Sequence, residues 1–266
     1  MKNETCAGGK HSKVRVTVLL CCNMDGSDRQ RLFFIGKSAK PRCFRDLYTV
    51  PVRYRSNTKA WMTKALFAEW LVELDQQMAA KGRKILLLLD NCSAHCVNPR
   101  LTSVELLHLP PNITAKVQPL DMGIIANFKV CYKRRVIERL LLNLEPNPAT
   151  PDPQRLRISL AMAVQMMYCA WNEVKQTTIR NCFVKAGVFA LDENTTIRGD
   201  DNNATEELQA AWDRLDATDV DFQDFLSAED RVVSHEEVSD EQLVREVRVE
   251  LRRRTSKCAA RDGRHS

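Results

Sequence analysis

The chain has 266 residues, 44% hydrophobic and 28% charged, which is enough apolar material for one sizeable core. Its apolar runs fall short of the ~20 residues that a membrane-spanning helix needs, and its polar N-terminus lacks a signal-peptide core. We therefore expect neither a membrane protein nor a secreted one, and we expect the ten scattered cysteines to be reduced.

The net charge of +6 is distributed unevenly along the chain. Residues 1–191 contain 29 Lys and Arg against 14 Asp and Glu, a net +15, whereas residues 192–266 contain 11 against 20, a net −9. A basic body favours binding of a polyanion, with the acidic segment as a separate module. The alternative is a solvated surface followed by a disordered tail.

The pattern predicts an antiparallel hairpin over residues 14–22 and 31–35, joined by a turn at Asn23–Gly26. A short strand is predicted near Val52–Tyr54. Thr63 is expected to cap a helix that ends at Gly82, because its apolar residues recur every three and four positions.

Residues 85–89 are five consecutive aliphatic residues, which predict a strand buried on both faces in the middle of an α/β sheet. Asp90 follows, and because an unpaired buried charge is costly we expect it where the strand emerges. A further strand is predicted over residues 104–109. A helix from Asp121 to about residue 142 comes next, and two helices over residues 156–174 and 178–185 follow a proline-rich linker.

Asp90 and Asp121 are thus expected at one edge of a sheet, where open α/β sheets bind ligands. Two carboxylates with water and phosphate oxygens suit Mg²⁺. The alternative, that Asp90 bonds a turn and Asp121 caps its helix, is equally well supported by spacing alone. His95 is expected to orient a carboxylate or contact a phosphate, unless it is an ordinary polar residue. Cys92, His95 and Cys96 suggest zinc, but no second ligand pair follows at zinc spacing.

The helix that begins at Asp121 is strongly basic. Complementing the helix dipole explains some of its cations, but five in eleven residues favour contact with nucleic-acid phosphates. These five, expected on its exposed side, are Lys129, Lys133, Arg134, Arg135 and Arg139.

Several segments stand in the order and spacing of one known family. They are residues 14–36, 36–44, 59–62 (Lys-Ala-Trp-Met), 89–95 (Leu-Asp-Asn-Cys-Ser-Ala-His), 109–114 (Leu-Pro-Pro-Asn-Ile-Thr) and 118–123 (Gln-Pro-Leu-Asp-Met-Gly). Over roughly residues 6–190 the chain resembles the DDE endonuclease domain of Tigger/pogo-type transposases and their host-adopted descendants, the Tigger transposable element-derived proteins and centromere protein B relatives.

The resemblance implies a ribonuclease-H-like α/β fold, a mixed sheet with flanking helices, in which three acids bind two Mg²⁺ ions for DNA strand cleavage and transfer. Asp90 matches the second acid and Asp121 the third, with Asn91 and His95 beside them. The first acid, expected on a strand before residue 14, has no counterpart, so we expect that strand to be missing. The expected division is a polar lead-in (1–13), an incomplete endonuclease-like domain (14–190) and an acidic, largely disordered tail (191–266) with short helices over residues 206–215 and 240–252.

These expectations favour a transposase-derived nuclear protein that binds DNA without full catalytic activity. The alternatives are an active Mg²⁺-dependent DDE nuclease or transposase, and an interaction module that binds nuclear proteins through the acidic tail. A sheet without its first strand leaves an edge unpaired, so self-association through that edge is also expected.

Overall fold

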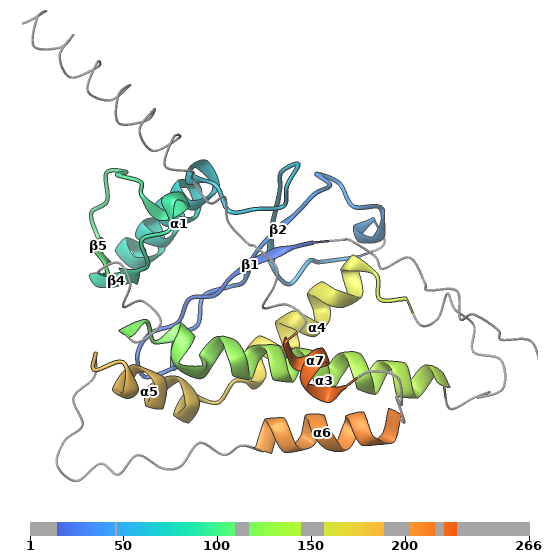
Figure 1. Ribbon diagram of the computed structural model, residues 1–266. Helices are drawn as coiled ribbons and strands as arrows, with labels where there is room; N and C mark the ends of the chain where they lie inside the picture. The colour runs from blue at the N-terminus through green and yellow to red at the C-terminus, as the bar shows by residue number, and fades with distance from the viewer. Residues whose placement is uncertain are drawn as a thin grey trace, which may run out of the picture.

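The computed structural model describes residues 15–45, 47–109, 117–144, 157–188, 203–215 and 221–227, and it shows a mixed α/β fold (Figure 1). The strands are β1 (Thr17–Leu19), β2 (Phe33–Gly36), β3 (Arg53–Ser56), β4 (Ile85–Leu89) and β5 (Val104–His108). The helices are α1 (Lys64–Ala80), α3 (Ile125–Leu144), α4 (Leu160–Glu173), α5 (Gln176–Lys185), α6 (Asn203–Leu215) and α7 (Phe222–Ser227), with short turns η1 (Arg42–Phe44), η2 (Ser93–His95) and η3 (Leu120–Ile124). None of these helices combines the length and apolar character needed to cross a membrane. The expected lead-in (1–13) and the expected helix over 240–252 lie outside the described residues.

The first three strands form one sheet in the order β1-β2-β3. β1 and β2 are antiparallel, as the hairpin prediction required, and β3 lies parallel to β2. The turn between β1 and β2 contains Gly26 at φ +74°, where a side chain would also meet the Cα atom of Gln176 at 3.0 Å. Both the predicted hairpin and the predicted short strand are therefore confirmed.

β2 is the strand that is buried on both faces. Phe33 and Ile35 pack with α1 residues on one face of the sheet, whereas Phe34 packs with α3, α4 and α5 on the other. All three side chains are fully buried. Successive residues of a strand point to opposite faces, so this short strand joins the two main hydrophobic clusters of the domain.

β4 and β5 form a separate, parallel two-stranded sheet. Ile85, Leu87 and Leu89 face α1, but Leu86 is 54% exposed and Leu107 of β5 is 45% exposed. The prediction that residues 85–89 are buried on both faces in the middle of a sheet is therefore wrong, because β4 pairs only with β5 among the described strands and α1 covers only one side of this sheet. The location of the strand itself is confirmed.

α1 begins and ends where the sequence predicted. The Thr63 hydroxyl accepts a hydrogen bond from the amide of Leu66 at 3.3 Å, and Gly82 follows the helix at φ +63°. Near the helix C-terminus, the buried Asp75 carboxylate accepts hydrogen bonds from the backbone amides of residues 102, 103 and 104 at 2.7–2.9 Å. These bonds lower the pKa of Asp75 and attach α1 to the start of β5.

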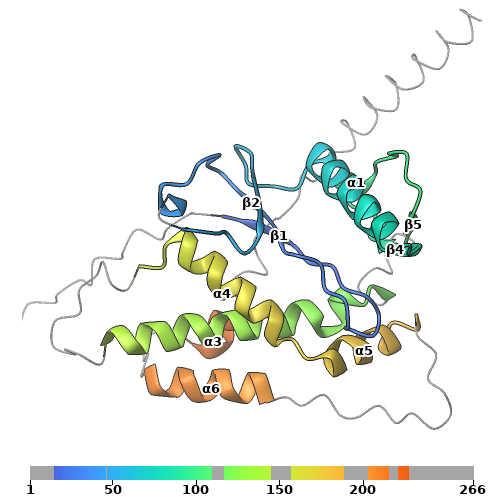
Figure 2. The same cartoon turned by 180° about the vertical axis from the view of Figure 1, so that it is seen from behind.

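The remaining helices form a layer below the β1-β2-β3 sheet, with α4 and α6 on either side of α3 (Figure 2). The helix predicted from Asp121 begins instead with the π-turn η3, which is followed by α3. The pair predicted over 156–174 and 178–185 is confirmed as α4 and α5. In the core between this layer and the sheet, Trp171 packs edge-on against Phe128 and donates to the carbonyl of Gln30 at 3.2 Å.

α6 and α7 come from the segment that was expected to be an acidic tail. The predicted short helix over 206–215 is confirmed as α6, which begins three residues earlier at Asn203. Leu208 and Ala211 of α6 form a small buried cluster with Ile137 and Leu141 of α3, and α7 packs at its edge. This part of the chain therefore packs onto the helical layer, because α3 supplies the apolar partners that the acidic segment lacks.

Candidate functional site

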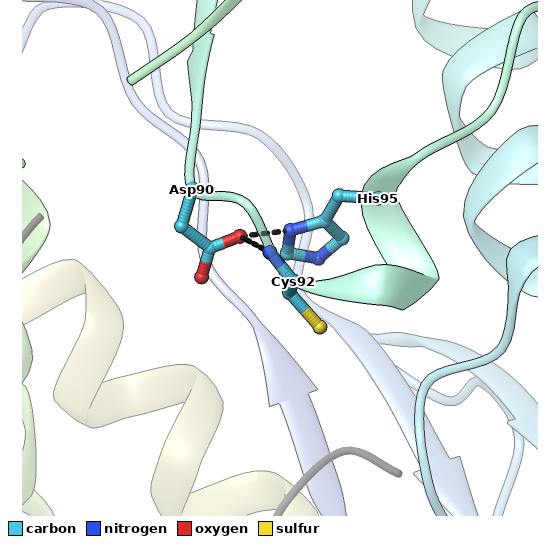
Figure 3. A group of neighbouring side chains, drawn as sticks. All are labelled: Asp90, Cys92 and His95. Atoms are coloured by element: carbon cyan, nitrogen blue, oxygen red, sulfur yellow. Dashed lines mark hydrogen bonds and ion pairs between the residues drawn. The ribbon is translucent and has the colours of Figure 1, made fainter. Parts of the chain in front are cut away.

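Asp90 lies directly after β4, at the C-terminal end of the strand where the sequence predicted it. One of its oxygens, Oδ1, accepts a hydrogen bond from the backbone amide of Cys92 at 3.2 Å and contacts Nδ1 of His95 (Figure 3). The parallel ladder continues one step beyond the strand, through the bond from the amide of Leu109 to the carbonyl of Leu89 at 2.7 Å. The carboxylate is thus held at a defined edge of the β4-β5 sheet.

The turn after Asp90 is fixed by its own polar groups. The amide of His95 donates to the carbonyl of Cys92 at 2.8 Å, and the side-chain amide of Asn91 donates to the carbonyl of Leu109. The His95 ring also packs against Phe67 of α1, with 4.4 Å between ring centroids. Asn91 and His95 therefore both lie beside Asp90, with Asn91 holding the turn and His95 contacting the carboxylate.

Asp121 lies in η3, on the helical side of the molecule. Gly123 in the same turn has φ +146°, and a Cβ there would lie 3.2 Å from Sγ of Cys182 in α5, so the turn requires glycine. Desolvation raises the pKa of Asp121, and the negative charge of Asp90 raises it further. The two carboxylates are therefore near enough for their charges to interact, and a shared metal site between them stays a prediction.

Two neighbouring carboxylates fit a hard divalent cation. Mg²⁺ takes oxygen ligands and commonly binds through one or two carboxylates, with water and substrate phosphate completing its coordination. A cation between Asp90 and Asp121 would relieve the repulsion that raises the pKa of Asp121. Asp90 and Asp121 are the residues that would hold it, and its chemistry would be polarisation of a phosphoryl oxygen.

The basic residues of α3 are placed differently from the prediction. Lys133 is only 2% exposed, and its Nζ donates to the carbonyl oxygens of Phe225 and Leu226 of α7 at 2.8 and 2.5 Å. Lys129 and Arg139 are half-buried. The predicted exposure of Lys133 is therefore wrong, because α7 covers it.

Two further cations of α3 form ion pairs inside the helical layer. Arg134 and Arg135 both pair with Glu173 of α4, and Arg134 also pairs with Glu207 of α6. α3 is thus not the open basic face that its spacing predicted, since acids from α4 and α6 neutralise much of its charge.

A basic loop between β2 and β3 was not among the predicted nucleic-acid contacts. Residues 37–45 contain four exposed cations and no acid, and they make no ion pair with the described residues. These cations are Lys37, Lys40, Arg42 and Arg45. A count of charges along the first fifty residues would have found them.

The rest of this loop is held against the sheet. The Tyr54 hydroxyl of β3 donates to the carbonyl of Ser38 at 2.7 Å, and the Phe44 ring packs edge-on against the Tyr54 ring at 5.0 Å. Gly36 permits this approach, since a Cβ at that position would collide with the Tyr54 hydroxyl. The four cations therefore extend from a fixed backbone, and a fixed backbone reduces the entropy lost on binding.

The chain is similar in sequence to known proteins over most of its described residues. The sequence profile of the DDE superfamily endonucleases matches residues 13–183. The chain is 34% identical over 200 residues to Tigger transposable element-derived protein 4 of Mus musculus, a match that covers 75% of this chain and 38% of that protein. It is also 34% identical over 184 residues to Major centromere autoantigen B of Homo sapiens, covering 69% of this chain and 29% of that protein.

The chain is also 33% identical over 209 residues to CENP-B homolog protein 2 of Schizosaccharomyces pombe, a match that covers 73% of this chain and 39% of that protein. The chain spans about two fifths or less of the length of these relatives. No solved structure matches it.

The profile match covers most of the described domain, and the chain therefore belongs to the DDE superfamily endonucleases, which generally use divalent metal ions, typically Mg²⁺. Within that class it is derived from Tigger/pogo elements and is related to centromere protein B.

Proposed function

We propose that this chain is a nuclear DNA-binding protein derived from a transposase, with a ribonuclease-H-like domain that holds the phosphate backbone without full catalytic activity. The observation that carries the proposal is the basic loop of residues 37–45, exposed on a body whose first 191 residues carry a net +15. Relatives named as transposable element-derived and centromeric proteins support DNA as the partner and the nucleus as the location.

The loop has the properties that phosphate contact requires. Its four side chains are cationic and exposed, and they make no ion pair with the described acids, so phosphate does not have to displace an internal partner. Each phosphate that a cation neutralises releases counterions from DNA. The slope of the logarithm of the binding constant against the logarithm of the salt concentration then becomes more negative by about 0.9. The loop is therefore proposed to supply several units of that slope.

The test is a salt titration of binding to labelled duplex DNA. Lys40→Ala/Arg42→Ala removes two cations from the loop, and Lys81→Ala/Arg83→Ala is a matched control. The control pair is also exposed but already pairs with Asp28, at 3.3 and 2.6 Å.

We expect the loop variant to reduce the magnitude of the salt slope by roughly 2, because two phosphate contacts are lost. The control should change the slope by clearly less, since it removes the same charge from an internal ion pair. Equal reductions in both variants would show that only net charge matters. A wild-type slope near zero would contradict DNA binding altogether.

Reduced cleavage is the second part of the proposal. Asp90 and Asp121 can supply two oxygen ligands to one ion, whereas the two-ion clamp that cleaves DNA needs a third, bridging acid that the family motifs leave unassigned in this sequence. The alternative function, an active Mg²⁺-dependent nuclease or transposase, is favoured by the electrostatic interaction between the same two acids.

Nicking of supercoiled plasmid in Mg²⁺ separates these two functions. We expect wild type and Asp90→Asn to give the same low background, with DNA binding retained by both. Nicking that wild type shows and Asp90→Asn loses would establish the enzyme instead. A tagged chain observed by microscopy would test the nuclear location.

Two further interactions are proposed for the rest of the chain. The acidic segment from residue 191 onward is proposed to bind nuclear proteins, on the strength of its net charge of about −9. Replacing Asp192, Glu193, Asp200 and Asp201 by the corresponding amides removes four of these negative charges and leaves α6 and α7 in place. This variant should lose those partners in a pull-down from nuclear extract, and full recovery would argue against this role.

Self-association is proposed through the strand edges. β1 and β4 each pair with one neighbour among the described strands, so each has an open edge that another chain can extend. Sedimentation over a hundredfold range of protein concentration should then show a growing dimer fraction. A constant monomer mass would contradict it.

A further inference from the structure

We propose that Asp90, Cys92 and His95 form a binding site for Zn²⁺ or a similar borderline transition-metal ion. The three side chains offer one oxygen, one sulfur and one nitrogen ligand atom, and these atoms all lie within 4.8 Å of one another. This site does not rest on DNA binding, and it differs in chemistry from a carboxylate site for Mg²⁺.

The three ligands come from one short turn, which fixes their relative positions. Asp90 ends β4, Cys92 precedes η2, and His95 is the last residue of η2. Backbone hydrogen bonds from Cys92 to the Asp90 carboxylate and from His95 to the Cys92 carbonyl hold the turn closed, at 3.2 and 2.8 Å. The ligand spacing is therefore set by backbone geometry before any ion binds.

The donor atoms select the metal. Mg²⁺ requires hard oxygen ligands, whereas thiolate and imidazole suit Zn²⁺ and related ions. Zn²⁺ binds sulfur at about 2.3 Å and nitrogen or oxygen at about 2.0–2.2 Å, so tetrahedral ligand atoms lie roughly 3.2–3.8 Å apart. Separations below 4.8 Å need only small side-chain rotations to reach that range.

Figure 3 shows which rotations are needed. The Asp90 oxygen and Nδ1 of His95 already point toward each other, and the Cys92 sulfur extends away from their contact. Rotation about the single Cα–Cβ bond of Cys92 would swing the sulfur around, and the ion would take the place of the direct contact between Asp90 and His95. The Phe67 ring packs against His95 and supports the imidazole in this orientation.

Three protein ligands leave a fourth position for water or a substrate oxygen, as in exchangeable zinc sites. The ion would also use the carboxylate whose negative charge acts on Asp121. Zn²⁺ and Mg²⁺ are therefore expected to compete for Asp90, so that loading with Zn²⁺ withdraws one ligand from the candidate Mg²⁺ site.

The test uses Co²⁺ as a spectroscopic substitute for Zn²⁺, added to the full chain under a reductant that contains no thiol. We expect a sulfur-to-cobalt charge-transfer band that saturates at one equivalent and disappears when Zn²⁺ is added. Cys92→Ser should abolish the band. Loss of a residue that only supports a metal ligand weakens metal binding by roughly 10- to 100-fold. His95→Gln removes a ligand itself, so it should weaken Co²⁺ binding by more than that.

Cys96→Ser is the matched control. Cys96 lies next to the same turn and is exposed, but it is not one of the three clustered ligands, so this variant should keep the full band. Circular dichroism of each variant checks that the chain folds. Absence of the band from wild type, persistence of the band in Cys92→Ser, or equal losses in Cys92→Ser and Cys96→Ser would overturn the proposal.

Discussion

Replacing Lys133 by methionine distinguishes a structural cation from a DNA contact. Lys133 is buried beneath α7 and donates to two carbonyl oxygens there, and its Nζ lies 5.2 Å from the centre of the Phe225 ring. Methionine keeps most of the apolar stem but loses the charge and both hydrogen bonds. We expect the free energy of unfolding to fall while DNA binding keeps its salt dependence.

The magnitude follows from these contacts. Each hydrogen bond from a charged donor contributes about 1.5–3 kcal/mol, so two would contribute about 3–6 kcal/mol if α7 stayed in place. The variant loses less stability than this if α7, which has only six residues, separates from α3 and exposes its carbonyl groups to water. Burying methionine also avoids the desolvation cost of an ammonium group. The net loss is therefore expected at about 2 kcal/mol.

Urea unfolding measures the loss in free energy of unfolding. Tryptophan fluorescence reports whether the α6–α7 contact is disturbed, because the Trp212 and Phe225 rings are 4.8 Å apart across that contact. Lys84→Met, at an exposed lysine, controls for removal of one charge. If Lys133 contacted phosphate instead, its variant would keep wild-type stability within about 0.5 kcal/mol and the salt slope would fall by about 1. That pair of results would refute the assignment of Lys133 to the α7 contact.

Two further predictions concern groups that anchor the fold. The folded-state pKa of Asp75 is lowered, so its carboxylate stabilises the protein above the unfolded value near 3.8, and this stabilisation is lost as the pH falls through the lower folded value. Asp75→Asn should therefore unfold more easily than wild type in urea at pH 7, with a difference that shrinks in acid; a difference independent of pH would contradict this. Gly36→Ala should cost about 1–3 kcal/mol by forcing its methyl group against the Tyr54 hydroxyl, and adding Tyr54→Phe should recover part of that loss in the same assay. Additive losses in the double variant would show that the two positions do not clash.

The positions of the strands along the chain were largely predictable, because local signals define them, whereas their division into two separate sheets was not predicted. The hairpin turn at Gly26, the Thr63 cap and the aliphatic run before Asp90 all act within a few residues. Burial was harder to predict. Five aliphatic residues at 85–89 specify a strand, but whether both faces are covered depends on elements elsewhere in the chain, and here α1 covers only one.

The candidate site shows the same limit. Asp90 could be placed from the strand that precedes it, whereas Asp121 lies in the π-turn η3 and its shared site with Asp90 stays a prediction. The basic helix could not be judged from spacing, since its partners Glu173 and Glu207 lie far along the chain. Cys92 and His95 already suggested zinc in the sequence, but only the turn geometry adds the Asp90 carboxylate to them.

The docking of α6 on α3 also affects how fragments of this protein will behave. The family profile ends at residue 183, so a fragment chosen from that match would stop before α6. Such a fragment would uncover Ile137 and Leu141 and would leave Arg134 without its Glu207 partner. Such a fragment would expose more apolar surface and carry more net positive charge than the 266-residue chain. An affinity for nucleic acid measured on the fragment would therefore overstate that of the chain.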